Sequence, residues 1–167
     1  ELSLSYQALR LAYDTREQLS ATGQAIPGSA LEFFVQSIEL ALRYSWDEQR
    51  RWQTTTRLGY GLSRDSGTGF FDYHHYQVSQ QLKYKRPTWE LSASARLGYF
   101  DYPVQTIGVG ETIQRHKTAV GLSFQAEKNL TKSWKVFLNY SHDRSISNLE
   151  FDDYRVHTVS AGVERRF

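Results

Sequence analysis

Five histidines are the side chains in this sequence best suited to acid–base chemistry. His142 is the most suggestive of them, because Ser141 and Asp143 flank it and Ser145 follows closely. A serine nucleophile needs a histidine base within hydrogen-bonding distance and a third group that orients the base. No motif in the sequence fixes that geometry. We therefore interpret the histidines as polar residues near strand ends, and predict no catalytic residue and no enzymatic activity.

Metal, phosphate and nucleic-acid chemistry have less support still. The sequence contains no Cys, which excludes a thiol nucleophile and a cysteine-based metal site. Its His and Asp residues have no recognised metal-ligand spacing, and Gly108-Val-Gly110 lacks the following helix of a phosphate-binding loop. A formal net charge of +2 gives no electrostatic reason to expect nucleic acid. We predict no metal site, no cofactor and no nucleic-acid partner.

A further set of charged residues is better suited to ion pairing than to catalysis. Its members share the polar faces of alternating segments, where a narrow interior would force opposite charges to pair because an unpaired buried ion is costly. The predicted ion network of this interior comprises Glu39, Arg57, Lys83, Glu90, Arg96, Glu127, Lys135 and Glu164. Counting residues from the intervening turns predicts the pairs Glu39–Arg57, Lys83–Glu90 and Glu127–Lys135.

The elements that position these residues are expected to be β-strands. Apolar and polar residues alternate in segments of about ten residues, which is the pattern of a half-buried strand. The clear segments are 52–62, 76–84, 89–99, 118–124, 134–140 and 159–167. Segments 34–46 and 2–13 are also interpreted as strands, although their apolar spacing would suit helices too. In the second of these the apolar phase slips between Ala8 and Leu9, which suggests a bulge.

The connections between these segments alternate strictly between short and long. The short ones are 47–51, 86–87 and 129–133, and the long ones are 14–30, 64–72, 101–114 and 143–155. Such alternation is typical of an up-and-down meander with both termini at the end of the short turns. We predict one domain over residues 1–167. Because the sequence starts at Glu1 without an initiator Met, we expect a mature form or an excised domain, such as the C-terminal barrel of a longer protein.

Aromatic residues favour a membrane barrel over a soluble sandwich, whose strands also have one apolar face. All four Trp flank short turns and tyrosines occupy the opposite strand ends, as expected of rings that prefer the headgroup level of a bilayer. Strands of about ten residues tilted by ~40° span roughly 25 Å, the height of an outer-membrane apolar band. The predicted membrane-interface aromatic girdle comprises Trp46, Trp52, Trp89, Trp134, Tyr60, Tyr99, Tyr140 and Phe167.

The last segment, 159–167, ends in Phe167 in phase with the apolar face and resembles the C-terminal strand of outer-membrane barrels. In strand number and loop asymmetry the whole chain resembles the small eight-stranded outer-membrane β-barrels of Gram-negative bacteria (OmpA/OmpX-like). This resemblance implies an all-β, eight-stranded antiparallel up-and-down transmembrane β-barrel in the cell outer membrane. The partners it implies are membrane lipid, lipopolysaccharide and, through the C-terminal strand, the outer-membrane assembly machinery.

Within this class, the leading prediction is a non-enzymatic membrane anchor or surface-interaction barrel that presents the long connections outside the cell. Residues 147–167 also resemble the ends of larger barrels fused to periplasmic helical repeats, so the alternative is part of a larger outer-membrane pore for polysaccharide or solute export. In a narrow barrel the charged residues would pair and close the interior, whereas in a wider barrel they would line a water-filled passage. A lipid-modifying barrel enzyme that uses outward-facing His142 or His116 comes third, and a soluble ligand-binding β-barrel fourth.

Overall fold

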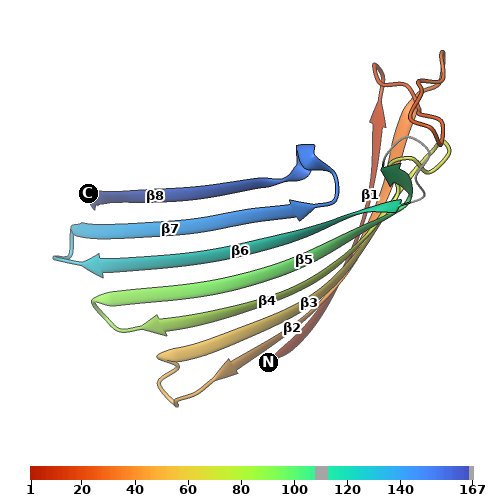
Figure 1. Cartoon of the computed structure of the whole chain (residues 1–167). Coiled ribbons are helices and arrows are strands. Elements are labelled where there is room, and N and C mark those ends of the chain that lie inside the picture. The colour runs from red at the N-terminus through yellow and green to blue at the C-terminus, as the bar shows by residue number, and fades with distance from the viewer. Residues whose placement is uncertain (108–112, 166–167) are drawn as a thin grey trace.

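A computed structural model describes residues 1–107 and 113–165 and shows one curved antiparallel sheet (Figure 1). The strands are β1 (Leu2–Tyr13), β2 (Leu31–Ser45), β3 (Trp52–Asp65), β4 (Tyr73–Lys85), β5 (Trp89–Ile107), β6 (Ile113–Asn129), β7 (Trp134–Ser147) and β8 (Tyr154–Arg165). A short 3-10 helix, η1 (Glu150–Asp152), precedes β8. Within the described ranges, no helix has the length and apolar character needed to cross a membrane.

The strands lie in the sheet in chain order, each antiparallel to the next, which confirms the predicted eight-stranded meander. Both doubtful segments are strands. The bulge suggested between Ala8 and Leu9 is absent, because β1 pairs with β2 without interruption from Leu2 opposite Leu42 to Tyr13 opposite Leu31.

The phase slip in β1 instead marks the point along the strand at which the environments of its two faces change. Beyond this point the ring of Tyr13 packs edge-on against Phe33, with centroids 5.8 Å apart, and Phe33 packs against Phe71 of the β3–β4 connection at 5.7 Å. On the opposite face, Arg10 forms an ion pair with Glu32 at 2.7 Å. Apolar residues therefore move to the face that the long connections cover.

Two of the long connections are shorter than predicted, because strands extend into them. Within the predicted connection 101–114, residues 101–107 belong to β5 and residues 113–114 to β6. The predicted connection 143–155 is reduced to the segment between β7 and β8. The β5–β6 ladder contains one register shift between Asp101 and Thr106. Pro103 lies inside this shift, where its missing N–H interrupts no ladder bond. Gly108-Val-Gly110 and Phe167 lie outside the described residues.

The sheet has two free edges. Among the described residues, β1 pairs only with β2 and β8 only with β7, and the two edge strands lie at opposite ends of the curved sheet (Figure 1). What the structure establishes is therefore an all-β meander of eight antiparallel strands.

The sheet is one layer thick and has almost no core of its own. Leu31 and Tyr102 are the only buried large hydrophobic side chains in the described ranges. By contrast, large apolar side chains on the apolar face are exposed along every strand, from Leu4 (69% exposed) on β1 to Val163 (62%) on β8. Soluble monomers rarely expose a continuous apolar patch of this extent. The apolar face therefore needs a partner that covers it.

Glycines on the polar face make room for neighbouring side chains. A Cβ added to Gly162 would lie 2.7 Å from the ring of Phe137, whereas a Cβ added to Gly59 would meet nothing closer than 3.7 Å. We expect Gly162→Ala to destabilise the fold by about 1–3 kcal/mol through overpacking. Gly59→Ala should be neutral or stabilising by up to about 1 kcal/mol, because it removes backbone freedom from the unfolded chain. Urea unfolding of both variants in detergent tests this, and equal effects would contradict it.

Candidate functional site

The polar face is the concave face of the sheet. A hollow of about 360 Å³ opens on it and is lined from five neighbouring strands, β3 to β7, as expected for the inside of the curve seen in Figure 1. Most of its lining groups are hydroxyls, amides and charges. They include Arg57, Gln77, Ser79, Gln81, Ser94, Arg96, Ser123, Ser141 and Asp143.

The charged residues of this face lie in pairs across neighbouring strands. Arg57 Nε lies 3.6 Å from Glu39 Oε1, and both side chains keep more than a third of their surface exposed, 35% and 40%. Nearer the short turns, Lys83 Nζ lies 2.5 Å from Glu90 Oε1, and Lys85 Nζ lies 3.8 Å from the other carboxylate oxygen. Each pair joins two strands of one hairpin, whose short turn fixes the register.

Lys135 joins three strands. Its ammonium lies 3.3 Å from Glu127 on β6 and 2.9 Å from Glu164 on β8, and its side chain is only 15% exposed. The structure thus brings together all three of these predicted residues, including Glu164, for which the sequence suggested no partner. This triad lies on the concave face at the short-turn end of β6, β7 and β8.

Arg96 pairs with Asp143, which the sequence pattern placed in the predicted connection 143–155. Its Nη2 lies 3.2 Å from Asp143 Oδ1 on β7, and the pair spans β6 directly above Gly121. A Cβ on Gly121 would come within 3.2 Å of both charged groups, so the glycine makes this crossing possible. The sequence pattern could have placed Asp143 on this strand, because the polar positions Asn139, Ser141 and Asp143 keep the same alternation along β7.

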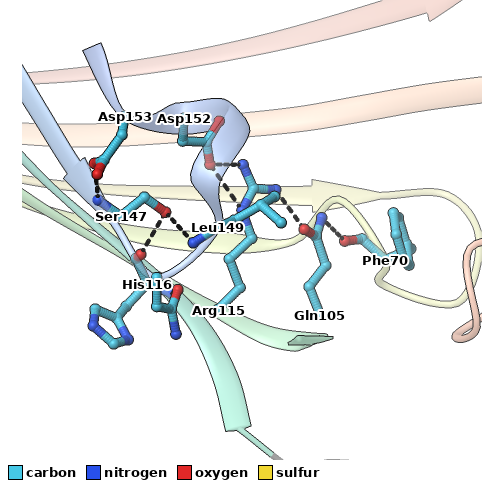
Figure 2. A network of polar contacts seen from close by, with 9 residues as sticks. Phe70, Gln105, Arg115, His116, Ser147, Leu149, Asp152 and Asp153 are labelled. Atoms are coloured by element: carbon cyan, nitrogen blue, oxygen red, sulfur yellow. Dashed lines mark hydrogen bonds and ion pairs between the residues drawn. The ribbon is translucent and has the colours of Figure 1, made fainter. Parts of the chain in front are cut away.

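A second polar cluster lies at the long-loop end of the same face (Figure 2). The guanidinium of Arg115 donates to the carboxylate of Asp152 and to the amide oxygen of Gln105, and Gln105 Nε2 donates to the carbonyl of Phe70 at 2.5 Å. Arg115 also lies 4.2 Å above the ring of Tyr102. The sequence pattern does not predict this cluster, because most of its residues fall in the segments interpreted as long connections.

Hydrogen bonds link two of the long connections and η1 to the strand ends beside them. Gln18 of the β1–β2 connection donates to Ser66 of the β3–β4 connection at 3.0 Å, and Gln105 on β5 donates to Phe70 of the β3–β4 connection. Arg115 on β6 joins Gln105 to Asp152 of η1, and Ser147 Oγ at the end of β7 donates to the carbonyl of His116 on β6 at 3.0 Å (Figure 2). The long-loop end is therefore a connected layer.

The predicted aromatic girdle residues that the structure describes lie on the opposite, convex face. At the short-turn end, Tyr44 packs against Trp46 and Trp52 against Tyr84, while Lys128 lies over Trp89 and Arg165 over Trp134. At the other end, Tyr60 packs against Tyr76, and Tyr99 and Tyr140 lie beside histidines. Phe167, the last predicted member, lies outside the described residues.

The structure does not bring the suggested serine–histidine groups together. Ser141 lines the hollow of the concave face, and the strand alternation of β7 places His142 on the convex face. The ring of His142 instead packs 4.4 Å from His157, whose Nδ1 hydrogen-bonds to Tyr140 Oη at 3.1 Å. His116 shares this convex position on β6, 6.2 Å from Tyr99.

The first short turn contains a carboxylate with a shifted pKa. Asp47 accepts from the Arg51 guanidinium at 2.8 Å and from the backbone N–H of Trp52 at 2.9 Å, and chiefly the former holds its pKa below the ordinary value. Ionised Asp47 therefore stabilises the turn above pH ~4, and this contribution is lost as pH falls through the lowered pKa.

We expect Asp47→Ala to destabilise the protein at pH 6, and we expect this effect to shrink as pH falls through the lowered pKa of Asp47 and the parent carboxyl becomes protonated. Urea unfolding of parent and variant at pH 6 and at successively lower pH measures the difference. A gap between parent and variant that stays constant as the Asp47 carboxyl becomes protonated would contradict the role of the ionised carboxylate.

Chemically, the concave face offers exposed ion pairs, amides and hydroxyls, which suit weak and exchangeable contacts with water, ions and hydrated solutes. The convex face offers aliphatic side chains between two rows of aromatics. No family model matches the chain, and no curated protein or solved structure is significantly similar to it.

Proposed function

We propose that this chain forms part of the wall of a transmembrane β-barrel of the outer-membrane type, whose concave face lines a water-filled passage for polar solutes. The observation that carries the proposal is the contrast between the faces of one single-layer sheet. The convex face is apolar, exposed and bounded by aromatics, whereas the concave face is polar and carries ion pairs accessible to water, Glu39–Arg57 and Arg96–Asp143. Lipid is the partner that covers a face of the first kind.

The free edges of β1 and β8, which lie at opposite ends of the curved sheet (Figure 1), favour a wide interior over a narrow one. Eight strands closed on themselves leave space only just sufficient for side chains. In this structure the Arg96 side chain is 55% exposed and its partner Asp143 40%, and a hollow lies beside them. In the proposed pore, further strands pair with the free edges of β1 and β8. The barrel then resides in the outer membrane of a Gram-negative cell, where the assembly machinery and lipopolysaccharide are its expected partners.

A membrane anchor with a narrow, eight-stranded interior is the second candidate. It is favoured by the ion pairs of the concave face and by the hydrogen bonds among the described residues at the long-loop end. Disulfide cross-linking between introduced cysteines distinguishes the anchor from the pore, and the natural chain has no cysteine that would interfere. We would place one cysteine on β1, at Ser3, Ser5 or Gln7, and one on β8, at Thr158 or Ser160, and oxidise the protein after folding it into lipid vesicles. A barrel closed by eight strands brings some of these pairs within disulfide distance.

For the pore, we expect no such cross-link in any pair, together with steady single-channel conductance of the parent protein. Efficient cross-linking with no conductance would overturn the pore in favour of the anchor. A protein that stays monodisperse and folded in plain buffer, without lipid or detergent, would contradict both.

A further inference from the structure

We infer that the convex face of β7 and β8 carries a binding site for the phosphate groups of an outer-leaflet lipid, formed by Arg144, Arg155, His142 and His157. The register places these residues as two cross-strand pairs, with Arg144 opposite Arg155 and His142 opposite His157. Strand alternation directs all four to the same face as the girdle residue Tyr140.

The two arginines are a directly opposed pair of like charges with no counter-ion in residues 1–107 and 113–165. Such pairs destabilise a sheet unless something neutralises them. On the adjoining strand, the residues opposite Arg144 and His142 are Val120 and Leu122, which offer no carboxylate. Both arginine side chains are exposed, and neither forms an ion pair with any residue that the structure describes.

An outward arginine elsewhere at the long-loop end shows the contrast. Arg10 on β1 forms an ion pair with Glu32 at 2.7 Å, with its neighbour strand supplying the acid. In the part of the chain that the structure describes, no acid pairs with the two arginines of β7 and β8 in this way, so their charges are available to an external anion. Guanidinium groups bind phosphate oxygens through two parallel hydrogen bonds, and two of them on adjacent strands can share one phosphate or hold two.

The histidines extend the same site toward the apolar band. His142 and His157 lie with ring centroids 4.4 Å apart, directly beside the arginine pair along the ladder. Nδ1 of His142 is shielded from solvent and has no hydrogen-bond partner among the described atoms. Imidazole N–H groups add donors for further phosphate oxygens.

The position of the cluster decides between a lipid and a free phosphate, and this step rests on the proposed function. Along the convex face, the pairs Trp134/Arg165, Val136/Val163, Leu138/Ala161 and Tyr140/Val159 lead from the short-turn end to the basic pairs. Arg144 lies ten residues beyond Trp134, or about 25 Å across the bilayer at a rise of ~3.3 Å and a tilt of ~40°. That distance spans the apolar band and places the guanidiniums at the opposite headgroup level.

The test uses the protein folded in neutral detergent, titrated with a bis-phosphorylated lipid A and with the same glycolipid after removal of its phosphates. We expect the phosphorylated lipid to bind roughly 10- to 100-fold more tightly, as charge-assisted hydrogen bonds allow. The double variant Arg144→Gln/Arg155→Gln should lose this preference. The control Arg165→Gln, on the same face of β8 at the other end, should keep it.

Equal binding of the two lipids by the parent, or an unchanged preference in the double variant, would overturn the site. Displacement of the lipid by millimolar inorganic pyrophosphate would overturn the assignment to a lipid in favour of free phosphate. Insertion of the parent and the double variant into phosphatidylcholine vesicles is measured separately. A parent that inserts but shows no phosphate preference refutes this site alone, whereas failure to insert refutes the proposed function.

Discussion

Leu122→Arg should destabilise the lipid-folded protein by about 2–4 kcal/mol, the cost of an arginine on the lipid face near the bilayer midplane. Leu122 lies on the convex face of β6 and is 46% exposed, with Ala95 and His142 opposite it on the flanking strands. In water this arginine would cost little, because the site is already accessible. A large loss of stability therefore indicates that lipid covers the convex face, and a small loss indicates water.

The matched control is Ser123→Arg, one residue further along the same strand. Ser123 lines the hollow of the concave face, where its hydroxyl hydrogen-bonds to Ser94 at 2.7 Å. A wide, water-filled interior tolerates the longer side chain, so we expect a change below about 1 kcal/mol. Urea unfolding in lipid vesicles measures both variants. If Ser123→Arg proves the more damaging of the two, the interior is narrow and the anchor gains support.

Arg115→Gln should have the second largest effect, about 1.5–3 kcal/mol, because it removes charge-assisted hydrogen bonds from a partly buried group. The side chains of Arg115 and Asp152 are 16% and 23% exposed, and the cluster joins β5 and β6 to η1. Without the guanidinium, the carboxylate of Asp152 loses its partner and η1 loses its attachment to the sheet.

The readout beside urea unfolding is chymotrypsin cleavage after Phe151, whose side chain is 96% exposed within η1. We expect faster cleavage in Arg115→Gln. Lys117→Gln serves as the control, since Lys117 lies two residues away on the same face and contacts the ring of Phe100 at 4.6 Å. Cleavage at the parental rate in Arg115→Gln would show that the cluster does not hold the loop.

The sequence predicted the strands well because a single-layer sheet has two unlike faces along most of its length. Alternation fails where a face changes its surroundings, as beyond Ala8 of β1, where the long connections cover what is elsewhere the polar face. It also fails to mark where strands end: the extension of β7 through Asp143 keeps the same alternation as its centre, so only the composition of the flanking residues suggested a loop.

The ion pairs likewise divide into those that the sequence predicts and those that it does not. Lys83–Glu90 was predictable because a two-residue turn fixes the register of its hairpin, so that counting residues gives relative height. Arg96–Asp143 spans three strands, and its geometry depends on Gly121 between them, which counting within one hairpin cannot reveal. Glycines of the concave face also depend on contacts between strands: Gly121 and Gly162 each lie beneath a side chain from a neighbouring strand.

Whether the sheet closes on itself could not be predicted from alternation, because each strand looks the same in a barrel of eight or more. Closure depends on what pairs with β1 and β8, and their edges are free in the described structure. The loop-end cluster of Arg115 was equally inaccessible, since it depends on a register shift between Asp101 and Thr106 that no residue pattern announces.

Thiol accessibility along β6 in lipid vesicles tests the proposed membrane wall most directly. The natural chain has no cysteine, so each introduced thiol is unique. Single cysteines would replace the concave residues Ala119, Ser123 and Gln125 and the convex residues Val120, Leu122 and Phe124. A membrane-impermeant maleimide should label the three concave positions and spare the three convex ones, which react only after unfolding in urea. Uniform labelling of all six positions, or labelling of the convex set alone, would contradict a lipid-covered convex face and a water-filled interior.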